Sequence, residues 1–252
     1  MLMKRRNEKE MKNIQYTFKR YEKKFLLTPK QYLRILPELK VAMDEDGYGV
    51  HTICNIYFDT DNFDLIRASV EKPAYKEKFR LRSYGIPDRN GVIFAEIKKK
   101  FDGIVYKRRV NAPLSDIRAF VMNGQHLDQD EQIQREIQWF LHRYSPVPKV
   151  FIGYERMAFQ GIEEPKLRVT FDRNIRFRCR ELELCAGDGG EPVFSEDRIV
   201  MEVKAPSAIP LWLVSLLSMN GIYAANVSKY GMCYQRHIAP HFLERKGFGY
   251  AE

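Results

Sequence analysis

Hydrophobic and polar residues alternate with a period of two along much of this chain. Successive side chains of a β-strand point to opposite faces of the sheet, so this alternation predicts strands with one apolar and one polar face. In the segment EKFRLRSYG, Lys78, Arg80 and Arg82 share one face, and Phe79 and Leu81 share the other. The same period predicts strands over residues 17–27, 51–58, 76–84, 92–100, 104–110, 149–160, 166–177 and 198–204.

Helices are predicted between these strands. Residues 28–39 begin with Thr28 as an N-cap followed by Pro29, a favoured first helical residue, and residues 112–123 end before Gly124. Residues 130–144 carry an apolar stripe at helical spacing, and a further helix is expected after Ser207. Long antiparallel strands with interspersed helices indicate the α+β class.

The organisation expected along the chain is simple. Residues 1–13 form a charged stretch without an apolar run and are expected to be a disordered basic tail. Residues 14–240 are expected to form a single domain, because no repeat or low-complexity segment interrupts them, and residues 241–252 to form a C-terminal tail. The most apolar stretch, IPLWLVSLLSMNGIYAA, is interrupted by polar residues and predicts a core-packed helix rather than a membrane span.

Charge is the unusual feature of the composition. The chain has 252 residues with 42 Lys and Arg against 33 Asp and Glu, a formal net charge of +9. Such an excess favours an anionic partner, which could be nucleic acid, anionic lipid or a phosphorylated substrate. The four cysteines form no CxxC pair, as expected in a reducing compartment, so we expect a cytoplasmic location.

The polar faces of several predicted strands carry mostly basic groups with an occasional carboxylate. The residues that share this phase are Arg20, Glu22 and Lys24; Glu96, Lys98 and Lys100; Arg168, Thr170 and Asp172; and Glu202 and Lys204. If the sheet closes into a barrel, these faces line a cationic, water-filled tunnel. Because buried cations without partners are costly, they must be hydrated, paired or neutralised by an anion.

Arg and Lys are the natural ligands of phosphate oxygens, and a long row of them suits a chain of phosphates better than a single phosphate. The few glutamates on the same faces suggest a divalent cation that bridges those oxygens, since hard oxygen ligands suit Mg²⁺ or Mn²⁺. The residues therefore predict an antiparallel barrel that binds a phosphate chain together with a metal.

Seven short motifs appear in a fixed order: RYEKKF, FRLRSY, EIKKK, YERMAF, LRVTFD, MEVKAP and VSKYG. Together they resemble the VTC-domain polyphosphate polymerases of the triphosphate tunnel metalloenzyme (CYTH-like) superfamily, from about Phe18 to Arg236. The resemblance implies an eight-stranded antiparallel β-barrel tunnel with helices packed outside. It also implies transfer of the γ-phosphoryl group of ATP to a growing polyphosphate chain, with Mn²⁺ or Mg²⁺ as cofactor.

The resemblance, together with the phase of the strands, assigns roles to individual residues. The groups expected to drive phosphoryl transfer are Arg80, Arg82, Lys98 and Lys229. The groups expected to bind ATP and polyphosphate are Arg20, Lys24, Lys78, Lys100, Tyr154, Arg156, Arg168, Lys204 and Ser228, with Ser228 and Lys229 expected on a last strand. Glu202 is expected to bind the metal, with Glu22 as a second, less specific candidate.

One residue departs from the family pattern, and several alternatives stay open. Eukaryotic members often have a lysine where this chain has Asn226. A triphosphatase with the same tunnel would cleave nucleoside triphosphate or tripolyphosphate with water; a tunnel open at both ends permits chain extrusion, whereas a plugged one favours hydrolysis. A non-enzymatic polyanion or nucleic-acid binder is a third class, but exposed aromatics do not alternate with the cations as such binders require. A membrane-protein partner that holds the chain at the inner face of a membrane is also left open.

Overall fold

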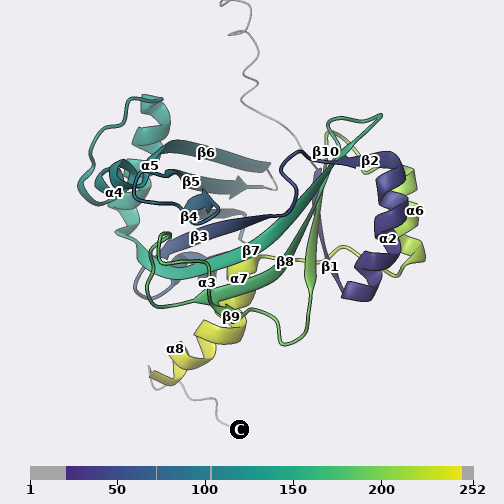
Figure 1. Cartoon of the computed structure of the whole chain (residues 1–252). Helices are drawn as coiled ribbons and strands as arrows, with labels where there is room; N and C mark the ends of the chain where they lie inside the picture. The colour runs from purple at the N-terminus through teal and green to yellow at the C-terminus, as the bar shows by residue number, and fades with distance from the viewer. Residues whose placement is uncertain (1–20, 72, 103, 246–252) are drawn as a thin grey trace, which may run out of the picture.

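The computed structural model describes residues 21–71, 73–102 and 104–245 (Figure 1). Its centre is one antiparallel sheet in which eight strands follow each other by hydrogen bonding. In spatial order they are β1 (Tyr21–Leu27), β10 (Ile199–Ala205), β8 (Arg168–Arg178), β7 (Val147–Gly161), β3 (His51–Asp59), β4 (Tyr75–Tyr84), β5 (Val92–Phe101) and β6 (Ile104–Pro113).

Each of the eight predicted strands is present, so the antiparallel α+β class is confirmed. The first was expected to begin at Thr17, and residues 17–20 lie outside the described part of the chain. Two short strands were not predicted: β2 (Met43–Glu45), which pairs with β7, and β9 (Glu191–Pro192), which pairs with β8. Two or three residues are too few to show a period of two.

The four predicted helices are α2 (Pro29–Ala42), α4 (Leu114–Asn123), α5 (Glu131–Tyr144) and α6 (Leu211–Met219). Thr28 caps α2 as predicted, because its side chain accepts a hydrogen bond from the Gln31 amide while the Gln31 side chain accepts one from the Thr28 amide. Four further elements were not predicted: α3 (Asp64–Val70), α7 (Lys229–Cys233), the π-helix η1 (Tyr234–Ile238) and α8 (Ala239–Arg245).

Two helical layers cover the outer face of the sheet (Figure 1). Helices α2 and α6 pack at one side, where Leu39 and Leu213 join Phe171 in a buried cluster. Helices α4 and α5 pack at the other side, where Phe120 and Phe140 lie against the β4–β5 region. Since the apolar faces of the strands are used in this way, their polar faces are left to line the concave side of the sheet.

The sheet curls until strands far apart in the hydrogen-bonding order approach each other. Lys98 Nζ of β5 lies 3.8 Å from Glu22 Oε1 of β1, although β1 and β5 are not hydrogen-bonded neighbours. In the described residues, the two ends of the strand order, β1 and β6, do not pair with each other. The concave face is therefore enclosed by strand curvature and side-chain contacts rather than by a closed ring of backbone hydrogen bonds.

Helix α6 corresponds to the most apolar stretch of the sequence. It buries Leu213, Leu216 and Leu217 against the sheet, as the prediction of a core-packed helix requires. None of the described helices combines the length and the apolarity that crossing a bilayer demands.

Candidate functional site

The concave face of the sheet gathers the basic side chains that the alternation predicted. The strand registers place Lys78, Arg80 and Arg82 of β4 opposite residues of β3 and β5 that share the same face. The cations on this face of the described residues are Lys24, Lys76, Lys78, Arg80, Arg82, Lys98, Lys100, Lys107, Arg109, Arg156, Arg168 and Lys204, and Lys229 of α7 joins them through Asp172. They outnumber the carboxylates among them, which are Glu22, Glu96, Asp172 and Glu202.

Glu96 organises the wall made by β4, β5 and β6. Its Oε2 accepts hydrogen bonds from Arg80 Nε at 2.9 Å and Nη2 at 2.7 Å, and its Oε1 lies 2.6 Å from Lys107 Nζ. Arg80 also donates to the Tyr57 hydroxyl at 2.8 Å. Burial alone would raise the pKa of Glu96, which is 2% exposed, but Arg80, Arg82 and Lys107 lower it well below its usual range. The group is therefore a fixed anion among cations.

Asp172 has the same role on the opposite wall. Arg156 of β7 donates to it from Nε at 2.7 Å and from Nη2 at 2.8 Å, and Lys229 of α7 donates to its Oδ2. Tyr154 lies beside both cations, with Lys229 Nζ 4.5 Å and Arg156 Cζ 5.4 Å from the centre of its ring. Its hydroxyl accepts a hydrogen bond from Arg82 at 3.2 Å, which links the two walls.

Glu22 and Glu202 lie on adjacent strands β1 and β10 with lysines between them. Glu202 Oε1 is 2.5 Å from Lys204 Nζ, Glu22 Oε1 is 3.1 Å from Lys24 Nζ, and Lys24 contacts both glutamates. Burial opposes the charge of Glu202, but Lys204 and Lys24 outweigh it and hold the pKa well below its usual range. Both glutamates are thus ionised and ready to act as oxygen ligands.

This pair fits a divalent cation of the Mg²⁺ type. Such ions are commonly held by one or two carboxylates together with the phosphates of the substrate, rather than by a complete cage of protein ligands. No group of three or more His, Cys, Asp or Glu side chains that could hold a metal ion occurs among the described residues. Glu202 and Glu22 would hold the ion, which would supply positive charge on this face.

Three lysines on the concave face have a lowered pKa. Burial, followed by repulsion from Lys76, Lys24, Lys98 and Arg80, lowers the pKa of Lys78 to about 7. Burial is also the main reason that the pKa values of Lys98 and Lys107 fall to about 8. Burial and mutual repulsion disfavour the charged form of these lysines. A bound anion would favour the charged form and so offset this cost.

The expectation that Ser228 and Lys229 lie on a last strand is wrong. Ser228 is the N-cap of α7 and Lys229 its first residue, because the Ser228 hydroxyl accepts a hydrogen bond from the amide of Gly231. Ser228 still lies by the basic face, since it accepts a hydrogen bond from Lys78 Nζ at 3.0 Å. A helix N-cap requires only one polar side chain at the right position. A single serine in a short motif therefore does not show whether the segment is a strand or the start of a helix.

Helix α7 covers one end of the concave face. The ring of Tyr230 stacks on Tyr57 with 4.8 Å between centroids, and its hydroxyl donates to the buried Asp59 at 2.9 Å. Both tyrosines belong to a buried apolar cluster with residues of β7, β8, β10 and η1, so the inner side of these strands is filled there. The basic residues near this end therefore face a wall made by α7.

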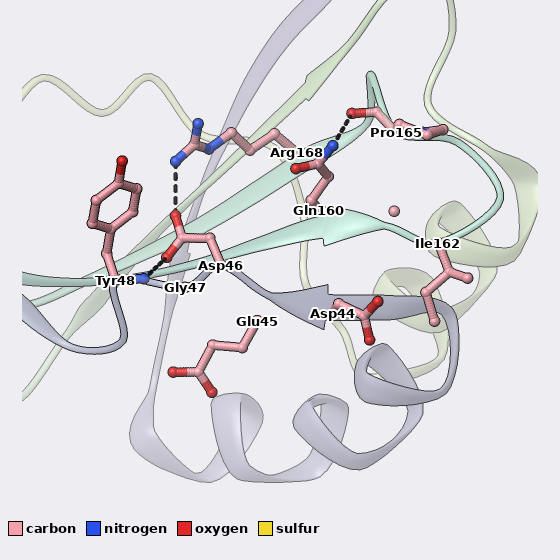
Figure 2. A pocket seen from close by; sticks show the side chains of 10 residues that line it. Asp44, Glu45, Asp46, Gly47, Tyr48, Gln160, Ile162, Pro165 and Arg168 are labelled. Atoms are coloured by element: carbon pink, nitrogen blue, oxygen red, sulfur yellow. Dashed lines mark hydrogen bonds and ion pairs between the residues drawn. The ribbon is translucent and has the colours of Figure 1, made fainter.

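A hollow lies beside β2 at the other end of the face, where Arg168 is located, and is called the mouth below. Figure 2 shows a hollow beside β2, in which Arg168 of β8 points toward the loop after β2 and Asp46 accepts a hydrogen bond from Arg168 Nη2 at 2.9 Å. Asp44 and Gln160 line the same hollow. The predicted phosphate ligand Arg168 thus lies at the mouth, with a carboxylate as its present partner.

The structure places the other predicted residues as follows. Lys24, Lys78, Arg80, Arg82, Tyr154, Arg156 and Lys204 lie on the concave face, as does Lys100, which is paired in register with Lys76. Arg20 lies outside the described residues. Their roles in binding and catalysis stay predictions.

Three further cations on this face, Lys76 of β4 and Lys107 and Arg109 of β6, are absent from the residues predicted above. The two cations of β6 contact Glu96, Lys107 at 2.6 Å and Arg109 at 4.0 Å. The signal was present, because YKRRV alternates and the tight β5–β6 hairpin sets Lys107 opposite Lys98 and Arg109 opposite Glu96.

Comparison with known proteins agrees with this geometry. The family model described as the VTC domain matches residues 19–238. Vacuolar transporter chaperone complex subunit 4 of Schizosaccharomyces pombe is 28% identical over 145 residues, which cover 49% of this chain and 20% of that relative. The chain thus matches only a small part of the length of this relative.

Two solved structures have a similar fold. A candidate adenylate cyclase from Bacillus halodurans aligns with a TM-score of 0.52 at 12% identity, covering 86% of this chain and 95% of its own. A candidate adenylyl cyclase from Hippeastrum, described as having a dominant triphosphatase activity, aligns with a TM-score of 0.52 at 16% identity, covering 85% and 94%. At such low identity the likeness concerns the fold alone.

Proposed function

Because this chain belongs to the VTC domain family and has the triphosphate tunnel fold, we propose that it transfers the γ-phosphoryl group of ATP to an inorganic polyphosphate chain. The observation that carries the proposal is the row of cations along an enclosed face, which exceeds what its own carboxylates neutralise. A single phosphate would engage only part of this row, whereas a linear polyanion engages all of it.

The proposed reaction needs alignment and charge neutralisation more than covalent help from the protein. In phosphoryl transfer the attacking and leaving oxygens lie roughly in line, and charge is spread over the oxygens of the transferred group. Arg80 and Arg82 face this position from one wall and Arg156 from the other, each oriented by hydrogen bonds already formed. The acceptor phosphate is ionised near neutral pH, so the reaction does not require a strong general base.

Glu202, with Glu22, is the proposed holder of Mn²⁺ or Mg²⁺. Such an ion would supply positive charge that neutralises part of the charge on the reacting phosphates. Lys24 and Lys204, which now pair with these glutamates, would then be released to contact phosphate. The protein's contribution is to keep both carboxylates ionised among the cations of this face.

A tunnel triphosphatase is the second candidate, and helix α7 is the observation that favours it. A growing polymer needs an exit, and α7 fills one end of the concave face through Tyr230 and its neighbours. Short products of hydrolysis could leave by the mouth through which the substrate entered. The triphosphatase activity described for the Hippeastrum protein of similar fold is consistent with this alternative.

One assay separates these functions. Purified protein is incubated with ATP and Mn²⁺, and ADP, free phosphate and polymer are followed together. ADP with polymer supports the polymerase, and ADP with only free phosphate supports the triphosphatase. No turnover, combined with RNA binding that weakens steeply with salt, would support a polyanion or nucleic-acid binder and reject both enzymes.

We also propose a protein partner for this chain. The Schizosaccharomyces pombe relative is named as a subunit of a complex and is much longer than the matched segment. A membrane-protein partner would hold this chain at the cytoplasmic face of a membrane. Co-sedimentation of the native protein with membranes, lost after salt or alkaline extraction of peripheral proteins, is the expected result, and a purely unbound native pool would contradict it.

A further inference from the structure

Asp172 lies where three elements of the concave face meet. It sits on β8, receives two hydrogen bonds from Arg156 on β7, and receives a third contact from Lys229 on α7. Its side chain is 0% exposed. A carboxylate in such a position is retained only if its partners compensate for its lost hydration, and here three donors do so.

The charge of Asp172 poses a problem for a polyanion site. Burial would raise its pKa, but Lys229 and Arg156 lower it, so the group is an anion at neutral pH. An anion beside the proposed phosphate path reduces the attraction between the tunnel and its substrate. Any benefit of Asp172 must therefore come from geometry rather than from its charge.

The contacts indicate what that geometry is. Arg156 uses its Nε and Nη2 edge for Asp172, which leaves the opposite edge of the planar guanidinium, at Nη1, for a phosphate. Lys229 has three donors and uses one for the carboxylate. Both cations also lie against the ring of Tyr154, which is 2% exposed, so their side chains have little freedom to rotate.

We propose that Asp172 is a positioning residue, which clamps Arg156 and Lys229 so that their remaining donors point into the phosphate path. The inference rests on the proposed function, because it takes that path to be the substrate site. It assigns to Asp172 no contact with substrate and no proton transfer. Its effect is to spare the bound phosphate the cost of ordering two flexible cations.

The substitution Asp172→Asn separates a clamp from a simple countercharge, because the two roles predict opposite signs. Asn has nearly the same shape, but its NH₂ group is a donor that would face the donors of Arg156 and Lys229. If Asp172 only lowers the positive potential, the variant gains one net positive charge and binds polyphosphate more tightly. If Asp172 is a clamp, the variant binds more weakly in spite of that charge.

The test is calorimetric titration of the full chain with inorganic tripolyphosphate in EDTA, at fixed ionic strength, so that binding is measured without metal or turnover. We expect Asp172→Asn to weaken binding about tenfold or more, as loss of preorganised geometry commonly does. The matched control is Glu131→Gln, which removes one exposed carboxylate of α5 and should leave the affinity unchanged. Unchanged or tighter binding by Asp172→Asn overturns the proposal.

A second comparison keeps the proposal testable if the variant Asp172→Asn folds poorly. Asp172→Asn/Lys229→Met removes one charge of each sign, and its affinity is compared with that of Lys229→Met alone. We expect the added Asp172→Asn still to weaken binding, because Arg156 loses its clamp, and equal affinities overturn the proposal. If the wild-type protein binds no tripolyphosphate, the proposed function itself fails, an outcome distinct from a wild type that binds and a variant that binds equally well.

Discussion

Lys98 Nζ of β5 lies 3.8 Å from Glu22 Oε1 of β1, and this contact joins two strands that are not paired with each other by backbone hydrogen bonds. Glu22 is at the same time 3.1 Å from Lys24. One glutamate therefore contributes both to the enclosure of the basic face and to the proposed metal site. A metal ion held by Glu22 would take the place of Lys24 and Lys98 as the partner of this carboxylate.

Glu202→Gln is expected to reduce turnover at least about a hundredfold, because it removes the charged ligand on which the metal and its bound phosphates depend. The fold should persist, because glutamine has the same shape as glutamate. Lys24 and Lys204, the partners of Glu202, are partly exposed, so water can hydrate them when the carboxylate is lost. The measurement is ADP release as Mn²⁺ is titrated, with thermal unfolding as the check on folding. Glu196→Gln, an exposed carboxylate paired with Arg198, is the control. Wild-type rates in Glu202→Gln would reject the metal role.

Arg80→Ala is expected to abolish polymer formation with little loss of fold. Arg80 supplies two of the hydrogen bonds on Glu96, but Lys107 at 2.6 Å remains to neutralise this carboxylate. Polymer yield and far-ultraviolet circular dichroism are measured on the same preparation. Polymer at the wild-type level would exclude Arg80 from the reaction, and an unfolded variant would mean that its main role is to satisfy Glu96.

Most strands could be predicted from the sequence because one face packs against helices and the other carries polar or charged residues over much of its length, so the period of two is strong. Helix α7 could not be predicted in this way. Its start depends on the N-cap Ser228 and on contacts of Ser228 with Lys78 and of Lys229 with Asp172, two residues that lie far away in sequence. The organising role of Asp172 could not be predicted either, because it too depends on contacts between residues distant in sequence. Its phase placed it on the concave face, but only the register across β7 and β8 brings it to Arg156.

Binding of polyphosphate is expected to take up protons near pH 8. Burial and the neighbouring lysines lower the pKa of Lys78 to about 7, so in the free protein this amine is largely neutral at pH 8. A bound polyanion favours the charged form, which raises the pKa and draws a proton from solvent. Affinity should therefore fall as pH rises above about 7. Calorimetry in buffers of different ionisation enthalpy measures the uptake, which Lys78→Met should reduce; equal heats in all buffers would contradict the prediction.

Lys78→Met is also expected to stabilise the protein in the absence of anions. The pKa of an unfolded lysine is about 10.4, so between pH 7 and that value the unfolded state binds more protons than the folded state, and wild-type stability rises with pH. The penalty of the charged amine is full below about pH 7. We expect the substitution Lys78→Met to raise the free energy of unfolding by about 1 kcal/mol or more at pH 6 and by less at pH 10. A gain that is independent of pH would show that packing, not charge, is responsible.

The pair of Asp46 and Arg168 at the mouth predicts a dependence on chain length. Arg168 Nη2 donates to Asp46 at 2.9 Å, so a phosphate that uses Arg168 must displace this carboxylate (Figure 2). A short anion held deeper, between Arg80 and Arg156, would not reach Arg168, whereas a long chain that extends to the mouth would. The cost of displacement therefore falls on long chains only.

Asp46→Asn is accordingly expected to tighten binding of long-chain polyphosphate by a few-fold, the range expected for a partly exposed ion pair worth up to about 1 kcal/mol. Tripolyphosphate affinity should stay within error of wild type. Asp44→Asn is the matched control, because it removes the same charge from the same hollow but leaves the Arg168 contact in place. Equal gains for long and short anions, or for both variants, would mean that Asp46 acts only through the general potential of the mouth.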